Sequence, residues 1–319
     1  GKIGDDLRMD YTAQGPTVGL AQRMEALASP DTCYVTGATA ALTAGYFELE
    51  ALGDFSVKGV AGAVPVHRLV GVGPATSRFD ISRARGLTRF VGRESDMAIL
   101  DRALAQAKAG HGQVVGIVAE AGTGKSRLCF EFVERCRATG MTVNTGTGLA
   151  HGKNLPYLPM IQVFRGYYGI GEQDDDVLFE FFGAPDPEHP TPRMDPDAKQ
   201  RALFSVLRRL VQGADPRVGS AHFATLIEDL HWLDAGSEAF LEQWVDAIAG
   251  TNSFLLLNFR PEYRAEWMKK SYYHQIPLAP LGPDAIRELL DDLLGADSST
   301  AGLAEAIHTR TGGNPFFTE

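Results

Sequence analysis

The chain has 319 residues, of which 44% are hydrophobic and 22% charged, and its formal net charge is -10. This length is sufficient for about two domains with cores of their own, and the ordinary composition excludes a fibrous or disordered protein. The acidic balance disfavours nonspecific binding to a phosphate backbone, because the 30 basic residues are scattered along the chain.

Cysteine usage and hydropathy exclude further classes of protein. Cys33, Cys129 and Cys136 form no CxxC pair and no zinc spacing, so we expect reduced thiols. No apolar run reaches the ~18–20 residues that cross a bilayer, and no signal-peptide pattern opens the chain. We therefore expect a cytoplasmic protein. Because the chain begins at Gly1 and ends on the apolar stretch 314–319, we expect a fragment of a longer protein.

Residues 1–72 have the pattern of a small α+β unit. Apolar residues recur at helical spacing over 17–28, with Thr17 as the N-cap, which predicts a helix. Short runs of β-forming residues predict strands at 7–12, 33–36, 47–52 and 64–70. The following stretch, 73–88, is small, polar and basic without an apolar period, and is therefore expected to be a linker.

From Phe90 the pattern changes to strands that alternate with helices. Helices are expected over 95–108 and 125–137, on either side of an unbroken β-branched run at 114–118. Further apolar runs lie at 141–144, 224–227 and 254–257. Continuous apolar strands alternating with helices predict a parallel sheet that is covered on both faces, and so an α/β fold. The acidic, proline-rich stretch 171–198 is expected to be an exposed insertion.

A glycine-rich loop follows the first strand of this pattern. Residues 119–126 read Ala-Glu-Ala-Gly-Thr-Gly-Lys-Ser, which matches the G-x-x-x-x-G-K-[ST] motif except at its first position. Gly122 and Gly124, with Thr123 between them, allow the backbone to curl so that successive N–H groups point at phosphate. The N-terminus of the next helix adds positive potential there. The loop therefore predicts a triphosphate-binding site.

The side chains that end the loop complete this prediction. Lys125 is expected to reach the β- and γ-phosphates, and Ser126 to offer its hydroxyl to Mg²⁺. Ala119 replaces the first glycine of the motif. Its Cβ is tolerable if the residue keeps a negative φ.

Two later strands end in polar residues. The run 222–227 closes on Glu228 and Asp229, and so resembles a Walker B element. One carboxylate is expected in the Mg²⁺ shell while the other orients or deprotonates the attacking water. By position Glu228 takes the metal side and Asp229 acts as base, although glutamate in place of the commoner aspartate leaves that division open. The run 254–259 leads into Arg260, which either senses the γ-phosphate or forms a surface salt bridge.

Five motifs occur in a specific order. They are 90–94, 119–126, 228–234, 260–262 and 312–317. Together they resemble the AAA-like, STAND-type ATPase module found beside bacterial class III nucleotidyl cyclases, over 89–319. The resemblance implies ATP as the nucleotide in preference to GTP, a P-loop ATPase core at 89–278, and the start of a truncated helical lid at 279–319.

The same resemblance implies where the base of the nucleotide lies. Val91, Gly92 and Arg93 correspond to the family's segment near the adenine. Asn314 and Pro315 correspond to its helical lid over the base.

The first unit resembles the C-terminal half of a class III cyclase catalytic domain, which is ferredoxin-like. The residues that carry the resemblance are 10–25 and 57–59. It implies that Thr12 helps to choose the purine, that Arg23 stabilises transition-state charge and that Lys58 contacts phosphates.

Two departures weaken a catalytic role for this half. Gly19 replaces the family's asparagine, and Pro16 replaces its aspartate or asparagine. The family's metal-binding aspartates belong to the first half of the domain, and without them nothing activates the 3′-hydroxyl. We therefore expect no cyclisation by this chain alone, and a half that is either degenerate or incomplete. Arg23 and Lys58 are read equally well as solvated charges.

The leading hypothesis is an ATP-binding signalling ATPase. Binding of ATP would change the packing of the lid, and hydrolysis would reset it. The alternatives are a nucleotidyl cyclase that the ATPase region regulates, and a scaffold that binds ATP without hydrolysing it. Expected partners are the nucleotide, other proteins or a downstream repeat domain, and a second copy through the cyclase-like half. Neither nucleic acid nor a membrane is expected.

Overall fold

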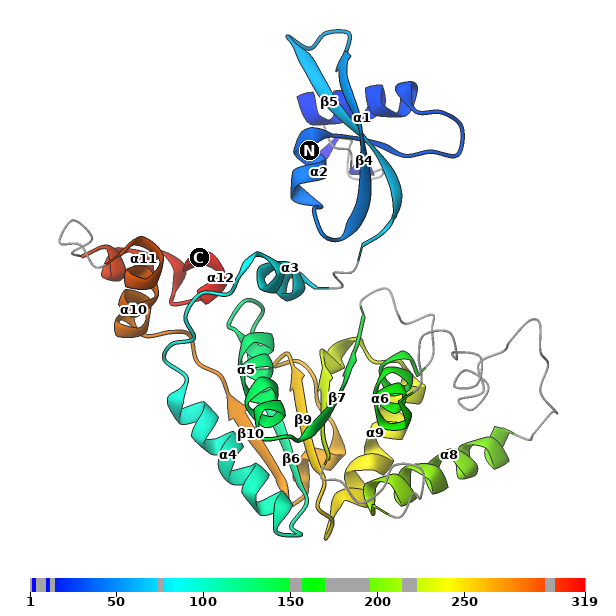
Figure 1. Cartoon of the computed structure of the whole chain (residues 1–319), viewed down its shortest axis with the longest axis vertical. Coiled ribbons are helices and arrows are strands. Elements are labelled where there is room, and N and C mark those ends of the chain that lie inside the picture. Colours follow the sequence, from blue (N-terminus) through cyan, green and yellow to red (C-terminus); the bar gives the residue numbers. More distant parts are fainter. Residues whose placement is uncertain are drawn as a thin grey trace. The chain divides into compact units, whose positions relative to one another are not determined.

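The computed structural model describes residues 2–3, 10–11, 15–73, 77–149, 157–169, 196–213, 223–295 and 302–318 (Figure 1). The chain divides into two compact units, unit 1 (Gly1–Leu87) and unit 2 (Thr88–Glu319). Thr12, most of the strand expected at 7–12 and nearly all of the insertion expected at 171–198 lie outside the described residues.

Unit 1 is built around a small antiparallel sheet with strand order β3-β5-β4. Its elements are β1 (Lys2–Ile3), β2 (Asp10–Tyr11), α1 (Pro16–Leu27), β3 (Tyr34–Thr36), α2 (Gly37–Leu42), β4 (Phe47–Ser56), β5 (Ala63–Val72) and α3 (Arg78–Arg85). The buried core consists of Met24, Val57 and Val66, with partly buried apolar residues around them. Both long strands extend beyond the apolar runs that predicted them, because ladder pairing continues through polar residues.

The segment that was expected to be a linker contains the helix α3. Its start is a capping box in which the Ser77 hydroxyl accepts a hydrogen bond from the Asp80 N–H, and the Asp80 carboxylate accepts one from the Ser77 N–H. A capping box satisfies two backbone donors at once, so a short helix forms without an apolar face. The absence of an apolar period in 73–88 therefore did not exclude a helix.

Unit 2 contains a five-stranded parallel sheet with strand order β10-β6-β9-β8-β7, which confirms the predicted α/β fold. The strands are β6 (Gln113–Val118), β7 (Thr142–Thr147), β8 (Phe223–Glu228), β9 (Phe254–Phe259) and β10 (Tyr273–Pro277). Every residue of β6 and β9 is buried. The sequence patterns did not predict β10, which lies at an edge of the sheet and is mostly polar.

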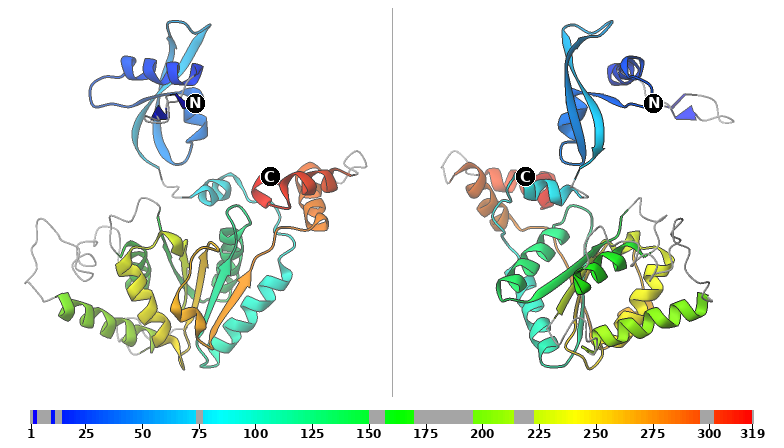
Figure 2. Two further views of the ribbon diagram at one scale, coloured as in Figure 1. Left: turned by 180° about the vertical axis from the view of Figure 1, so that it is seen from behind. Right: turned by 45° about the vertical axis from the view of Figure 1, so that its right-hand side comes forward.

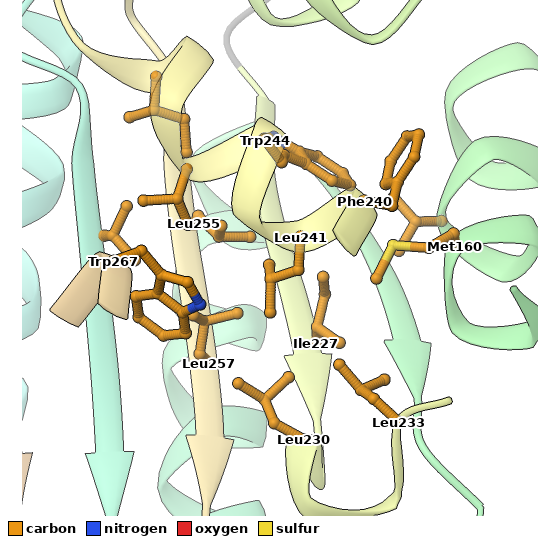
Figure 3. Close-up of a cluster of buried hydrophobic side chains, with 14 of the residues drawn as sticks. Met160, Ile227, Leu230, Leu233, Phe240, Leu241, Trp244, Leu255, Leu257 and Trp267 are labelled. Carbon is orange, nitrogen blue, oxygen red and sulfur yellow. The ribbon is translucent and has the colours of Figure 1, made fainter. Parts of the chain in front are cut away.

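Helices cover both faces of this sheet (Figures 1 and 2). They are α4 (Glu94–Lys108), α5 (Lys125–Ala138), α6 (Leu158–Tyr168), α8 (Pro196–Val211) and α9 (Ala235–Ile248), with the short 3-10 turns η3 (Leu230–Trp232) and η4 (Glu266–Lys269). Apolar residues of α4 and α5 form one buried cluster with the strands, and those of α6, α8 and α9 form another. Figure 3 shows the second cluster, with Trp244 and Leu241 of α9 packed on the side chains of β8 and β9.

The last part of unit 2 is helical. It comprises α10 (Pro283–Leu294), α11 (Leu303–Thr311) and α12 (Pro315–Thr318). These helices have a core of their own, in which Val91 packs with Leu281, Ile286, Leu289, Leu290 and Ala304. Within the part of the chain that the structure describes, no helix has the length and apolar character of a membrane span.

Candidate functional site

The loop between β6 and α5 has the backbone conformation that its glycines predict. Gly122 has a φ of 81° and Gly124 a φ of 100°, both in the left-handed region that favours glycine. Gly124 is the N-cap of α5, and no side chain caps this helix. The first N–H groups of α5 are therefore available to an anion, as at other helix N-termini.

Ala119, the residue that departs from the motif, fits the loop. Its side chain is buried, and it is not among the non-glycine residues with positive φ in the described part of the chain. The condition under which alanine is tolerable at this position is therefore met.

Lys125 points back into the loop. Its side chain is only 8% exposed, and its ammonium donates hydrogen bonds to the carbonyl oxygens of Ala119 at 2.7 Å and Glu120 at 2.9 Å. Burial lowers the pKa of Lys125, whereas the charge of Asp229 raises it. An ammonium has three donors, so these two carbonyls account for two of them.

The acidic residues lie at the carboxyl end of β8, beside β9. Glu228 is the last residue of β8, and Asp229 follows with a left-handed φ of 56°, a conformation that aspartate adopts more readily than most residues. The buried amide of Asn258 donates to Glu228 Oε1 at 2.9 Å and accepts from the Asp229 N–H at 2.8 Å. A single side chain from β9 therefore fixes both acidic residues.

The sequence patterns did not identify Asn258. It is the polar residue within the buried run Phe-Leu-Leu-Leu-Asn-Phe of β9, and that position was the available signal. Its partner on β6 is Ile117, so it lies between the glycine-rich loop and the acidic strand end. Its amide also approaches the sulfur of Cys129 on α5 at 3.5 Å. Burial raises the pKa of that thiol well above its usual value, which keeps it neutral.

Arg260 and His231 lie near the same edge of the sheet. The Arg260 guanidinium carbon is 5.8 Å from the centre of the Trp232 ring, in a cation–π arrangement. Within the described ranges Arg260 forms no ion pair, so the salt-bridge alternative has no partner there. The His231 side chain is 8% exposed, and its Nδ1 lies 4.0 Å from Asp229 Oδ1. Burial lowers the pKa of His231, and the sequence patterns assigned it no role.

The segment that the resemblance placed near adenine contacts the protein through its side chains. Arg93 is 6% exposed, and its guanidinium donates to the carbonyl oxygens of Ala279 at 2.7 Å and Thr123 at 3.0 Å. Val91 is buried against α10, and a Cβ on Gly92 would lie 2.7 Å from Ala285 Cβ. The Arg93 side chain therefore ties the glycine-rich loop to the segment before α10.

Asn314 and Pro315, which the resemblance placed in a lid over the base, lie against the glycine-rich loop. The Asn314 amide donates to the carbonyl oxygen of Ala121 at 3.1 Å, and the Phe316 N–H donates to that of Gly122 at 3.4 Å. A Cβ on Gly122 would lie 2.7 Å from Asn314 Oδ1. The start of α12 is thus in direct contact with the turn that would hold phosphate.

In unit 1, Arg23 is engaged in contacts within the unit. Its Nε donates to the Lys58 carbonyl oxygen at 2.5 Å and its Nη1 donates to the Gly19 carbonyl oxygen at 2.6 Å. A Cβ on Gly19 would lie 2.8 Å from Arg23 Nη1, so glycine makes room for the guanidinium. Arg23 thereby ties α1 to the turn between β4 and β5, and the Lys58 side chain is exposed. The reading of Arg23 as a simply solvated charge does not hold.

The donor set for a metal is small. In the described ranges no group of three or more histidine, cysteine, aspartate or glutamate side chains has the arrangement of a metal site. The residues expected to bind Mg²⁺ are one hydroxyl, that of Ser126, and the carboxylates of Glu228 and Asp229. Mg²⁺ commonly takes one or two carboxylates and completes its shell with water and substrate phosphates, so this donor set fits it.

Comparisons with known proteins agree with the fold of unit 2. The model of the AAA ATPase domain family matches residues 89–257, just over half of the chain. An uncharacterized protein of Rhizobium meliloti strain 1021 is 26% identical over 294 residues, which cover 86% of this chain and 28% of that protein. The chain therefore spans under a third of the length of this curated relative.

Two solved structures are similar to part of the chain. A Signal Transduction ATPase with Numerous Domains (STAND) protein with a tetratricopeptide repeat sensor from Pyrococcus horikoshii is 16% identical with a TM-score of 0.44, over 71% of this chain and 28% of that one. The adenylyl cyclase CyaB from P. aeruginosa is 30% identical with a TM-score of 0.22, over 23% of this chain and 38% of that one. The family match includes both the glycine-rich loop and the acidic strand end, and the chain accordingly belongs to the AAA ATPase domain family.

Proposed function

We propose that this ATPase is a nucleotide-dependent switch whose hydrolysis site lies at the carboxyl edge of the unit 2 sheet. The observation that carries the proposal is the meeting of three motifs at the carboxyl ends of the adjacent strands β6, β9 and β8. The loop with Lys125 follows β6, Arg260 follows β9 and Asp229 follows β8. These three charged side chains come from separate motifs, and a triphosphate with its metal needs cations and carboxylates in such proximity.

In this proposal, each residue has a distinct task. The amides from Gly122 to Ser126 bind the phosphates, while Lys125 exchanges its carbonyl partners for phosphate oxygens. Ser126 and Glu228 hold Mg²⁺, which supplies neutralisation of phosphate charge. Asp229 orients and deprotonates the attacking water, and Arg260 stabilises the charge that develops during hydrolysis.

The switch itself is proposed to be the helical region α10–α12. Asn314 and Phe316 bond to the carbonyls of Ala121 and Gly122, so a change in the loop on nucleotide binding would reach α12 directly. Val91, Gly92 and Arg93 would border the adenine through their backbone, since two of their side chains are buried elsewhere. Signalling through such a region requires a contact that differs between two states, and the bonds from α12 to the loop are proposed to be that contact.

Unit 1 has a non-catalytic role in this proposal. Arg23 is held by two backbone carbonyls, which favours a structural task over stabilisation of a transition state. In this proposal, unit 1 does not form a cyclic nucleotide. Its role is that of a sensor or of a docking surface, for instance for a second copy of the chain.

The proposal is tested by Lys125→Ala in the full chain. We expect the affinity for ATP, measured by isothermal titration calorimetry with Mg²⁺, to fall by about 100-fold or more, because the main cation that faces the phosphates is removed. We expect release of phosphate to stop. The matched control is Lys108→Ala, which removes an exposed lysine at the end of α4 and should change neither quantity.

Three outcomes separate the alternatives. Unchanged ATP affinity in Lys125→Ala would refute the assignment of the loop. Tight binding by the wild-type chain without phosphate release would favour the non-hydrolysing scaffold. A cyclic nucleotide formed from ATP with Mn²⁺ would favour the regulated cyclase.

A further inference from the structure

The turn that follows β9 is joined to α9 by a partly buried hydrogen bond that lies outside the glycine-rich loop. Tyr263 Oη donates to Glu238 Oε2 at 2.7 Å, and the tyrosine side chain is 9% exposed. The Tyr263 N–H also donates to the Arg260 carbonyl oxygen at 3.0 Å, which closes the turn. Tyr263 is therefore bonded both to Arg260 and to a neighbouring helix.

The ring of Tyr263 packs in the apolar cluster beside the turn. It packs against Phe259 with ring centres 5.1 Å apart and against Trp267 with centres 6.4 Å apart. It belongs to the apolar cluster between the sheet and α9. The packing surrounds the ring with apolar groups, and the hydroxyl is the group that bonds the turn to Glu238.

Glu238 is itself fixed relative to the acidic strand end. It lies in the first turn of α9, where its N–H donates to the Asp234 carbonyl oxygen at 3.0 Å. The Asp234 carboxylate caps the helix by accepting from the N–H groups of Gly236 at 2.9 Å and Ser237 at 3.0 Å. A capped first turn has little freedom, so Glu238 is a firm anchor.

The Tyr263 hydroxyl is the donor of this bond. Burial, followed by the charge of Glu238, raises the pKa of Tyr263 far above its usual value, so the hydroxyl stays protonated. Burial raises the pKa of Glu238, and the hydrogen bond from Tyr263 acts in the opposite direction.

Arg260, at the start of the turn, has a second attachment. Its guanidinium lies over the ring of Trp232, which belongs to η3. Both attachments of the turn, at Trp232 and at Glu238, thus lie in the segment that follows Asp229. The turn and this segment form a clasp, defined here as Trp232, Glu238, Arg260 and Tyr263.

We infer that Tyr263 and Glu238 are positioning residues that hold Arg260 at the sheet edge from which Lys125 and Asp229 also project, and that they control turnover and not nucleotide binding. This inference rests on the proposed function of the site. A cation that must meet developing charge is sensitive to its position, since a displacement of about 1 Å can cost roughly 100-fold in rate. Ground-state binding, in contrast, depends mainly on the loop amides and Lys125.

The test is Tyr263→Phe in the full chain. Phenylalanine keeps the ring and removes only the hydroxyl. We expect kcat for phosphate release to fall by about 10-fold or more, while the Kd for a non-hydrolysable ATP analogue stays within about twofold. Glu238→Ala should behave in the same way, whereas Glu238→Gln, which retains an acceptor oxygen, should keep most of the turnover.

A matched control separates positioning from stability. Tyr167 lies in α6, and its hydroxyl is also bonded within the core, to Thr225 Oγ1 at 2.7 Å. Tyr167→Phe should lower the thermal midpoint by a comparable amount and leave kcat unchanged. Equal losses of kcat in Tyr167→Phe and Tyr263→Phe would overturn the inference, as would an unchanged kcat in Tyr263→Phe.

A spectroscopic readout decides the inference even without turnover. The protein is labelled with fluorotryptophan, and the ¹⁹F signal of Trp232 is assigned with the variant Trp232→Phe. This signal should shift in Tyr263→Phe, because the Arg260 guanidinium moves away from the Trp232 ring. The signal should not shift in Tyr167→Phe. If the wild-type chain releases no phosphate but the Trp232 signal shifts as expected, the proposed function fails and the clasp stands. If the signal does not shift, the clasp is refuted.

Discussion

A buried amide, that of Asn258, decides how the two acidic residues are presented. It bonds a carboxylate oxygen of Glu228 and the backbone of Asp229, so it acts on a side chain and on a main chain at once. A buried hydrogen bond to a charged group contributes about 1.5–3 kcal/mol. Such a residue can be recognised in a sequence only as a polar interruption of an apolar strand, because its partners come from another strand.

Replacing Asn258 by leucine should therefore affect both stability and catalysis. Leucine has a similar size but leaves the Glu228 carboxylate without this donor and the Asp229 N–H without an acceptor. We expect the free energy of unfolding of unit 2 to fall by about 1–3 kcal/mol, together with a loss of phosphate release. Urea unfolding at pH 7 measures the first quantity. The control is Asn252→Leu, which changes an exposed asparagine before β9. It should change neither the free energy of unfolding nor the release of phosphate.

Sequence motifs predicted the residues of the site whose partners are local. Gly122, Gly124 and Lys125 belong to one continuous loop, whose backbone dictates their types. The contacts of Arg93 could not be predicted in this way, because its carbonyl acceptors at Thr123 and Ala279 are distant in sequence.

Among the elements, the glycine-rich loop and α12 depend on each other. Gly122 satisfies two requirements. It adopts a left-handed φ of 81°, and its lack of a Cβ leaves room for the Asn314 side chain. The loop therefore faces α12 with its carbonyls, and in the proposed site its N–H groups would bind phosphate. A loop bonded on both sides can transmit a change from one to the other.

Gly122→Ala should separate these two requirements. Its Cβ would lie 2.7 Å from Asn314 Oδ1 and 3.0 Å from Phe316 Cβ, so α12 must move away. Gly140→Ala is the matched control, with a φ of 78° and no heavy atom within 4 Å of the added Cβ. Both variants should lose about 1–3 kcal/mol through the strained φ. Only Gly122→Ala should lose hydrogen-exchange protection in residues 302–318, and equal protection in both would contradict the coupling.

The elements themselves were predictable where their apolar pattern was regular. The runs at 114–118, 224–227 and 254–257 became β6, β8 and β9, because buried parallel strands need continuous apolar residues. The edge strand β10 and the polar helix α3 were not predicted, because neither has a regular apolar pattern. Ladder hydrogen bonds to β6 hold β10, and a capping box starts α3.

At the level of the whole molecule, the two units differ in how much core they contain. The core cluster in the described part of unit 1 contains three buried residues, whereas unit 2 has one large buried cluster on each face of its sheet, of which one is drawn in Figure 3. Small cores give marginal stability, because little apolar surface is removed from water. We therefore expect unit 1 to unfold at a lower temperature than unit 2.

Calorimetry on two variants tests this difference. Trp244→Ala empties a fully buried site between α9 and the sheet, and should destabilise unit 2 by about 3–5 kcal/mol. Met24→Ala should shift only the transition of unit 1. If each variant moved both transitions equally, the chain would unfold as one cooperative body and the expectation of separate stabilities would be wrong.

The buried guanidinium of Arg93 bears on which fragments of this chain can be prepared. It bonds Thr123, 30 positions away, and Ala279, 186 positions away. A shortened protein limited to 89–257, the stretch that matches the family, would omit the second acceptor and the strand β10 that pairs with β6. The guanidinium would lose its bond to Ala279 and keep Thr123 and the Asp96 carboxylate, 3.6 Å away, as partners, while a strand edge would be uncovered. Expression designs for unit 2 should therefore extend past Ala279 into α10.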